Sequence, residues 1–349
     1  MNTSQIAERF RVFAQDCIGS SPLYEFLSLK IAQDDALLEL CTYARSGQPV
    51  PNLLFGAVHY LLLSGVEHTL KKYYPSIVQS PRKTTDSFVY FKDFCIKHQN
   101  QIQHILQTRR VQTNEVRRCS YLFPCFTYIY NQVEKPLTLI EIGTSAGFQL
   151  LFDKYRYTYQ KGKYGNPAST VHIESEVVGD AVPPFSDDMP PIASRTGMDL
   201  QINDVSDPND ALWLQALIWP EHDRRRRLFQ QTVQHLLRHK DEITFIEGDG
   251  VKLLPRVASD IPHDTVICVF HTHVANQMTV QMKERLLAHV RTIGAQRDIF
   301  HLYNNIWDNE LYLDSFVNGV GKRRIMASTD AHGRWFWWRE EELKRASKT

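Results

Sequence analysis

Apolar side chains recur at helical spacing through about the first 130 residues of the chain. Prolines lie between the apolar stretches, where they interrupt helices. This pattern predicts a helical N-terminal cap over residues 1–130. The three clearest stretches have apolar positions at Ile6, Phe10, Phe13 and Cys17; at Leu53, Leu54, Val58, Leu61, Leu62 and Val66; and at Phe88, Phe91, Phe94 and Cys95.

The pattern changes after Pro136. Residues 137–142 form a nearly unbroken apolar run, which is typical of a strand buried on both faces. A glycine-containing turn and a helical pattern over residues 148–155 follow. Strand-like segments then alternate with a helix over residues 278–290, which predicts an α/β domain over residues 131–349 with a mostly parallel sheet. These segments are residues 244–246, 265–270, 299–303 and 334–338.

Charge and composition exclude several classes of protein. The 349 residues include 40 Lys and Arg against 39 Asp and Glu, so no basic excess indicates nucleic-acid or membrane-surface binding. The most apolar segment, residues 53–66, is shorter than the roughly 20 residues that cross a bilayer. Six dispersed cysteines and an N-terminus without a signal-peptide pattern predict a cytoplasmic protein with reduced thiols.

The segment Glu141-Ile-Gly-Thr-Ser-Ala-Gly147 carries the most chemical information. A glycine turn between a first strand and a helix lets a ligand approach the backbone, and the helix start offers free N–H groups. Ser145 occupies the place of the middle glycine of the dinucleotide fingerprint, so the pattern also fits a tight connection without a ligand.

The same residues match GxSxG, the nucleophile turn of α/β-hydrolases, in which Ser145 would attack the substrate. Asp249 and a later histidine, His271, His273 or His332, follow in the order that a triad needs. The helical region upstream lacks earlier strands and a glycine-rich oxyanion loop, which argues against this alternative.

Four segments together resemble the bacterial family DUF2332, whose core looks like a class I S-adenosylmethionine-dependent methyltransferase. The resemblance covers nearly the whole chain and implies a Rossmann-like, doubly wound sheet. The segments are EIGTSAGFQLLFDKYRY, RTGMDLQINDVSDPNDALWLQALIWPEHDRRRRLFQQTV, EGDG and VFHTHVANQM.

The methyltransferase resemblance implies roles for particular residues. Asp199, at the end of the second strand, would accept the ribose hydroxyls of S-adenosylmethionine, and Asp249 would lie by the adenine. About fifty residues separate Gly147 from Asp199, which an inserted hairpin within residues 155–176 would explain. Either acid also fits a turn or a helix cap. The methionine end of the cofactor would lie against Glu141, Gly143, Thr144, Ser145 and Gly147.

The segment 270–277 follows another buried strand, where open α/β sheets bind their ligands. His271 and His273 are candidates for proton transfer, and Asn276 and Gln277 for substrate contact. Hydrogen bonding within the loop explains these histidines equally well. Two histidines do not complete a zinc site, so no metal is expected.

Polar residues also precede the sheet. Asn114, Glu115 and Arg118 are candidates for contact with a small-molecule substrate, although a helix-capping pattern explains Thr113 and Asn114 without a ligand. We expect a methyltransferase in which His271 or His273 relays the substrate proton. The alternatives are a non-catalytic protein that binds an adenosyl ligand and, with less support, a serine hydrolase.

Overall fold

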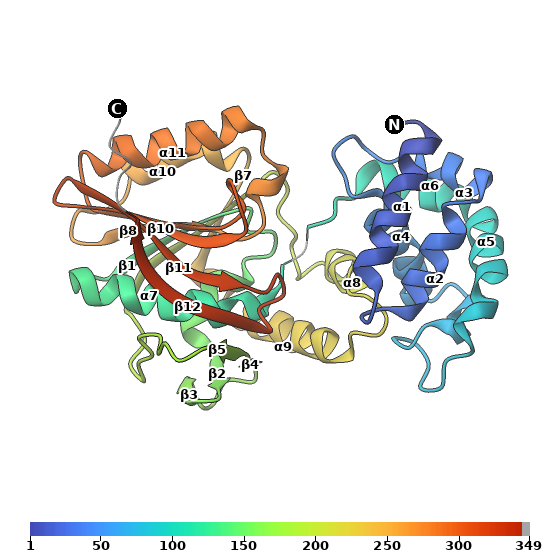
Figure 1. Ribbon diagram of the computed structural model, residues 1–349, viewed down its shortest axis with the longest axis horizontal. Helices are drawn as coiled ribbons and strands as arrows, with labels where there is room; N and C mark the ends of the chain where they lie inside the picture. Colours follow the sequence, from blue (N-terminus) through green and yellow to red (C-terminus); the bar gives the residue numbers. More distant parts are fainter. Residues whose placement is uncertain (113, 344–349) are drawn as a thin grey trace. The chain divides into compact units, whose positions relative to one another are not determined.

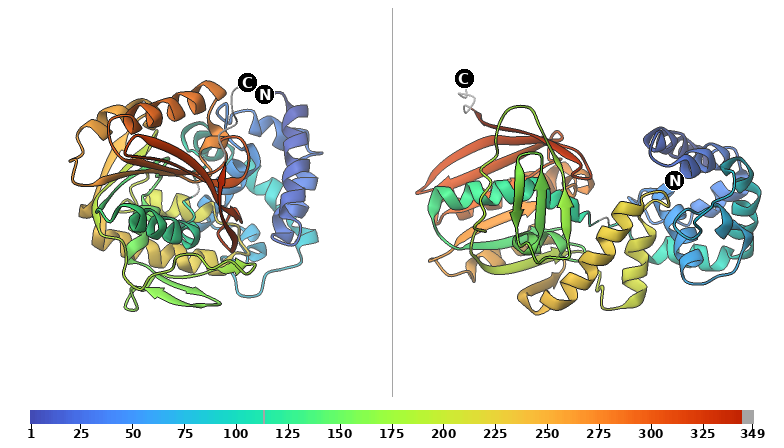
Figure 2. Two further views of the ribbon diagram at one scale, coloured as in Figure 1. Left: turned by 60° about the vertical axis from the view of Figure 1, so that its left-hand side comes forward. Right: turned by 90° about the horizontal axis from the view of Figure 1, so that it is seen from below.

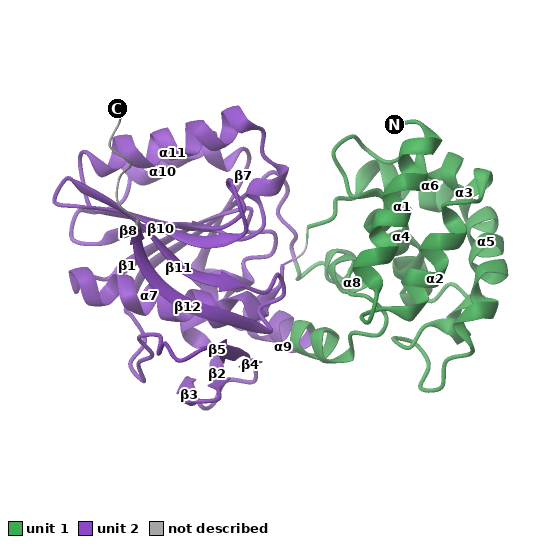
Figure 3. Cartoon of the chain, in the orientation of Figure 1, with its two compact units in different colours: residues 1–113, 205–229 green, residues 114–204, 230–349 purple. Residues whose placement is uncertain are grey.

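A computed structural model describes residues 1–112 and 114–343, and the chain divides into two compact units (Figure 3). Unit 1 comprises residues 1–113 and 205–229, and unit 2 comprises residues 114–204 and 230–349. The sequence pattern places the boundary at residue 130. The structure instead assigns residues 114–130 to unit 2 and adds residues 205–229 to the N-terminal helices.

Unit 1 is helical, as the spacing of its apolar residues predicts. The start of α1 is capped by Asn2, whose side chain accepts a hydrogen bond from the Gln5 amide. Its helices are α1 Thr3–Cys17, α2 Pro22–Ile31, α3 Asp35–Cys41, α4 Val50–Leu63, α5 Ser87–Lys97, α6 Gln99–Thr108 and α8 Pro208–Ala216, with short 3-10 helices η1 Thr69–Tyr73 and η2 Thr84–Asp86.

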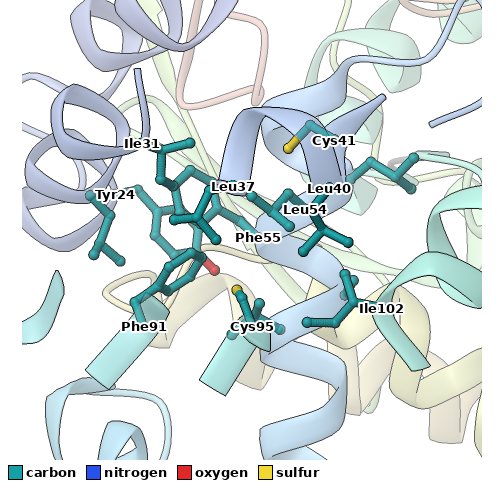
Figure 4. Close-up of a cluster of buried hydrophobic side chains, with 14 of the residues drawn as sticks. Tyr24, Ile31, Leu37, Leu40, Cys41, Leu54, Phe55, Phe91, Cys95 and Ile102 are labelled. Atoms are coloured by element: carbon teal, nitrogen blue, oxygen red, sulfur yellow. The ribbon is translucent and has the colours of Figure 1, made fainter. Parts of the chain in front are cut away.

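The core of unit 1 is built around α4, which is apolar on nearly all sides (Figure 4). Phe55 of α4 stacks on Tyr24, with ring centroids 4.1 Å apart. Trp213 of α8 is 1% exposed, belongs to the same core, and donates its indole N–H to the Arg110 carbonyl at 2.9 Å. The segment 205–229 therefore supplies part of the core of the N-terminal helices.

Unit 2 contains two sheets. Its strands are β1 Leu137–Ile142, β2 Arg156–Tyr159, β3 Gly162–Gly165, β4 His172–Glu174, β5 Glu176–Val178, β6 Ile192–Asp199, β7 Ile243–Glu247, β8 Val266–His271, β9 Ile299–Tyr303, β10 Glu310–Val317, β11 Val320–Thr329 and β12 Trp335–Leu343. Its helices are α7 Cys119–Val133, α10 Gly250–Ser259 and α11 Val280–Gly294, with 3-10 helices η3 Val116–Arg118, η4 Phe148–Lys154, η5 Lys240–Glu242 and η6 Ala275–Gln277. Helix α9, Asp223–His239, continues from unit 1 into unit 2.

The larger sheet has nine strands in the order β5-β12-β11-β10-β9-β8-β1-β6-β7. From β7 to β9 all neighbouring strands are parallel, and β9 to β12 form an antiparallel meander. The chain passes from β1 outward through β6 and β7, then crosses to β8 and β9 on the other side of β1. The predicted α/β class and largely parallel sheet are therefore confirmed, and the direction of winding reverses between β1 and β8.

Helices cover both faces of this sheet (Figures 1 and 2). Ile140 and Ile142 of β1 pack in one core with Val251 of α10 and Leu286 of α11. On the other face lies α7, where Phe126 meets Phe270 of β8 at a ring-centroid distance of 5.3 Å. Burial on both faces explains the unbroken apolar run of β1.

The insertion between η4 and β6 includes the expected hairpin, formed by β2 and β3, and β4 pairs with β2 to complete a three-stranded sheet. Tyr155, Tyr157 and Tyr159 donate their hydroxyls to the backbone carbonyls of Phe148, Phe152 and Ser120 at 2.5–2.7 Å. These hydrogen bonds tie the insertion to η4 and α7. Within residues 1–112 and 114–343, every helix is too short or too polar to cross a membrane.

Candidate functional site

The turn that follows β1 is held against β6 by its own backbone. Gly143, Ser145 and Gly147 have φ values of +77°, +53° and +85°, in the left-handed region. The amides of Gly143 and Thr144 donate to the Met198 carbonyl at 2.7 and 3.1 Å. These two N–H groups, which the sequence predicts to face a ligand, are therefore bonded within the protein.

Close packing explains why glycine occupies positions 143 and 147. A Cβ atom at Gly143 would lie 2.3 Å from Val274 Cγ2, and one at Gly147 would lie 2.8 Å from Phe245 Cε1. Both contacts are shorter than carbon atoms tolerate. The two glycines thus let the side chains of Val274 and Phe245 approach the turn.

Glu141 is a buried carboxyl at the carboxyl end of β1, 2% exposed. The Thr144 hydroxyl donates to its Oε2 at 2.6 Å. Burial raises the pKa of Glu141 to about 8. The Thr144 hydrogen bond and the charge of Arg118 act to lower this pKa, whereas the charge of Asp199 raises it further. The side chain is accordingly protonated at neutral pH, an acid held beside the turn in its uncharged form.

Asp199 ends β6, next to β1, as the sequence predicts for the second strand of the sheet. Its Oδ2 accepts the Ser145 amide at 2.8 Å, and its Oδ1 accepts the Gln201 amide at 3.3 Å. A residue 54 positions away along the chain thereby meets the turn after β1. The structure brings Glu141, Ser145 and Asp199 into one group.

Asp249 has the capping role that the sequence left open. It is the N-cap of α10, and its carboxylate accepts the amides of Val251 and Lys252 at 3.1 and 3.4 Å. The cap accounts for an acid between Gly248 and Gly250 without a ligand. Contact of Asp249 with an adenine remains a prediction.

Ser145 is buried, and its hydroxyl accepts a hydrogen bond from the side-chain amide of Asn203 at 3.0 Å. The Ser145 carbonyl accepts the Asn203 backbone amide at 3.1 Å. A carboxamide cannot take the serine proton as the imidazole of a hydrolase triad does. The arrangement around this hydroxyl therefore favours a structural role for Ser145.

The polar segment before α7 reaches the same edge of the sheet. Asn114 donates to the Thr144 carbonyl, and Arg118 donates to the Ala331 carbonyl at 2.9 Å and to the Thr272 hydroxyl at 3.3 Å. Glu115 caps η3 by accepting the Arg117 amide. Asn114 and Arg118 thus contact the turn after β1 and the residue after β8, whereas Thr113 lies outside the described residues.

His271, the last residue of β8, and His273, two residues later, lie on different sides of the sheet. His271 ends β8 and pairs in register with Tyr303, which packs beneath α11. His273 has a φ of +56°, and its amide donates to Asn304 Oδ1 at 2.8 Å. Burial lowers the pKa of His273 to about 3, with further lowering by Arg118. Only His273 therefore lies on the side of Arg118, and Asn276 and Gln277 are exposed on η6.

Left-handed backbone conformations mark the ends of three neighbouring parallel strands. Six described residues other than glycine have positive φ, and three of them follow β1, β8 and β9: Ser145, His273 and Asn305. Such conformations are costly and concentrate at functional sites. The sequence motifs do not single out Asn304 and Asn305, although a pair of asparagines directly after the buried β9 is a usable signal.

Among the residues placed by the structure, no three histidine, cysteine, aspartate or glutamate side chains gather closely enough to hold a metal ion.

Residues 7–338 match the family described as "Uncharacterized protein conserved in bacteria (DUF2332)". The chain belongs to the DUF2332 family. No curated protein and no solved structure matches it. The match of this DUF2332 chain runs from α1 into β12 and so includes elements of both units.

His271 and His301 of this DUF2332 chain form a fully buried pair beneath α11, with ring centroids 5.2 Å apart. All four ring nitrogens lack a hydrogen-bond partner. Burial lowers the pKa of His301 to about 3 and that of His271 well below its ordinary value. Both imidazoles are therefore neutral in the folded protein at physiological pH.

We expect this pair to destabilise the protein in acid. The pKa of His301 is lower in the folded protein than its value of 6.5 in the unfolded chain. Its contribution to the free energy of unfolding is therefore fully present above pH 6.5 and is lost as the pH falls towards 3. At about pH 5.5 each of the two histidines lowers the free energy of unfolding by about 1.4 kcal/mol. Urea unfolding at about pH 7.5 and about pH 5.5 measures this change. Between the two pH values, His301→Phe should lose less free energy of unfolding than wild type does. His263→Phe, on the surface, should behave as wild type, and equal losses in all three proteins would contradict the prediction.

Proposed function

We propose that unit 2 binds S-adenosylmethionine and transfers its methyl group to a small-molecule substrate. The observation that carries this proposal is the hydrogen bond between the Asp199 carboxylate and the Ser145 amide. It brings an acid at the end of the second strand to the glycine turn after the first. The order β7-β6-β1-β8-β9 supports the proposal, because it is the same as that of five consecutive strands in the Rossmann order 3-2-1-4-5-6, in which ligands bind where the winding direction reverses.

The hydrogen bonding of the turn favours an adenosyl ligand over a dinucleotide. A pyrophosphate needs several free N–H groups at the turn. Here the amides of Gly143 and Thr144 donate to Met198, and that of Ser145 donates to Asp199. S-adenosylmethionine has no phosphate, and its ribose hydroxyls can donate to a carboxylate. Asp199 is the residue best placed for that contact.

Glu141 suits the other end of the same ligand. A buried carboxyl that is neutral when the site is free can ionise when a cation lies next to it, because an opposite charge stabilises the carboxylate. The ammonium and sulfonium groups of S-adenosylmethionine are such cations. Asn114 offers a further acceptor, since its buried Oδ1 has no hydrogen-bond partner.

The bound cofactor supplies an electrophilic methyl group. The chain's part is to hold the substrate nucleophile in line with that methyl group and to receive its proton. His273 is the residue proposed to receive it, because its imidazole is neutral and its buried Nε2 has no hydrogen-bond partner, although a pKa lowered to about 3 by burial and by Arg118 makes it a weak base. Glu141 and Asp199 would hold the cofactor, whose sulfonium would supply the methyl group to the nucleophile and keep the electron pair of the carbon–sulfur bond. Asn276 and Gln277, exposed on η6, remain candidates for substrate contact.

Titration calorimetry of Asp199→Asn tests the cofactor site. Wild type should bind S-adenosylmethionine and its demethylated product, S-adenosylhomocysteine. The variant should bind both at least about ten-fold more weakly, since a hydrogen bond to a charged group is worth about 1.5–3 kcal/mol. Asp241→Asn, at an exposed acid of η5, is the matched control and should bind as wild type. Absence of binding to folded wild type, or equal binding by Asp199→Asn, would overturn the proposal.

Two further measurements separate the alternatives. Transfer of a labelled methyl group to a small-molecule extract distinguishes an enzyme from a protein that only binds the cofactor. A fluorophosphonate probe that labels wild type but not Ser145→Ala would indicate a serine hydrolase. The Asn203 contact with the Ser145 hydroxyl predicts no labelling.

A further inference from the structure

The carboxyl ends of β8 and β9 carry buried polar atoms that nothing in the protein satisfies. His273 Nε2, Asn304 Nδ2 and Asn305 Oδ1 are buried and have no hydrogen-bond partner. Leaving such an atom unpaired costs about 1–3 kcal/mol, so each calls for a partner supplied from outside the chain. All three belong to unit 2 and to two neighbouring strand ends.

The backbone holds these residues together in strained conformations. The His273 amide donates to Asn304 Oδ1 at 2.8 Å, which ties the loop after β8 to the end of β9. His273 and Asn305 have φ values of +56° and +61°. Asn304 itself is fully buried. A fixed arrangement of this kind, with unmet hydrogen bonds, is what a preorganised ligand site requires.

The identities of the atoms limit the chemistry of the partner. Asn304 Nδ2 is a donor and needs an acceptor, whereas Asn305 Oδ1 is an acceptor and needs a donor. Of the nearby charged groups, Asp330 pairs with Arg334 at 2.7 Å, and Arg118 donates to the Ala331 carbonyl and the Thr272 hydroxyl. A neutral group with both a donor and an acceptor is therefore favoured over an ion, whose burial would be costly.

We infer that the ends of β8 and β9 form a second ligand position for a neutral carboxamide-like edge, as found in amides and nucleobases. The ligand's carbonyl oxygen or ring nitrogen accepts from Asn304, and its N–H donates to Asn305. This position does not involve Glu141 or Asp199, which are proposed to hold S-adenosylmethionine, and its occupation does not require that cofactor. It shares His273 with the proposed proton transfer.

Nicotinamide and nicotinate are suitable probes, because they share a ring and differ in a carboxamide against a carboxylate. Binding to the full-length protein is measured by saturation-transfer NMR at millimolar concentration, without S-adenosylmethionine. Nicotinamide should bind, and nicotinate should bind at least about ten-fold more weakly, since it lacks the donor for Asn305 and would bury a charge. Failure of nicotinamide to bind, or equal binding of the two, would overturn the inference and leave the methyl-transfer proposal untouched.

Two variants locate the site. Asn305→Gly keeps the left-handed backbone and removes the acceptor, so it should weaken nicotinamide binding at least about ten-fold. Asn318→Gly is its matched control, since Asn318 also has a positive φ of +50° but lies in the β10–β11 turn. Asn304→Asp keeps an oxygen for the His273 amide and removes the donor, and it should also lose binding. Wild-type binding by Asn305→Gly, or ordered water as the only occupant in a crystal soaked with nicotinamide, would contradict the assignment.

Discussion

Gly143→Ala is expected to lower the free energy of unfolding by about 2–5 kcal/mol. A left-handed backbone costs an L-residue about 1–2 kcal/mol, and overpacking in a dense core typically costs about 1–3 kcal/mol. Both terms apply, because φ is +77° and the new Cβ would lie 2.3 Å from Val274 Cγ2. Urea unfolding followed by circular dichroism measures the change.

Gly319→Ala is the matched control for this substitution. Its φ of +74° is nearly the same, but nothing lies within 4 Å of a Cβ at that position. It should therefore lose only the backbone term, about 1–2 kcal/mol. Adding Val274→Ala should recover part of the loss in the Gly143 variant. Equal losses of free energy at positions 143 and 319 would show that a Cβ at position 143 fits without a clash, which would contradict the prediction.

Glu141→Gln is expected to stabilise the protein by about 3 kcal/mol at pH 7. Glutamine keeps an acceptor for the Thr144 hydroxyl and does not ionise. In wild type the folded pKa is about 8 and the unfolded value is 4.5, so stability present below pH 4.5 is lost as the pH rises through 8. The gain should be small at pH 4.5, grow with pH and level off above pH 8. Urea unfolding across this range tests the profile, and a gain that does not depend on pH would contradict it.

The same variant should bind S-adenosylmethionine more weakly, because only a carboxylate can pair with its cationic groups. Wild-type binding should release a proton below pH 8, which calorimetry in buffers of different ionisation enthalpy detects. Glu174→Gln, in the exposed β4 position, is the control for both experiments. Unchanged affinity in Glu141→Gln would exclude Glu141 from the cofactor site while leaving the Asp199 contact to be judged separately.

Local signals predicted the first part of the sheet. The apolar run of β1, the glycines after it and the tyrosines of the inserted hairpin each carry their structure within a few residues. Asp199 was placed at the end of the second strand despite the long gap, because the methyltransferase resemblance marked the position. Its contact with Ser145 depends on the pairing of β1 with β6, which adjacent residues do not encode.

The segment His271-Thr-His273 shows a case in which spacing along the sequence does not predict the structure. The predicted strand ends at Phe270, so His271 and His273 are expected together in the loop that follows it. The strand ends at His271, and the positive φ of His273 redirects the chain towards Asn304. Likewise β10 and β11 went unrecognised, since polar and basic residues such as Lys322 and Arg323 interrupt the apolar pattern of β11.

The composition of unit 1 bears on how the chain emerges from the ribosome. The N-terminal helices are synthesised first, yet Trp213 belongs to their core and follows residue 113 by about a hundred positions. Until that stretch is translated, the apolar surface around Gly56 that receives the Trp213 ring stays uncovered. The N-terminal helices therefore complete their core only after the whole chain through β6 has been synthesised. Folding of the amino-terminal half is consequently delayed relative to its own synthesis.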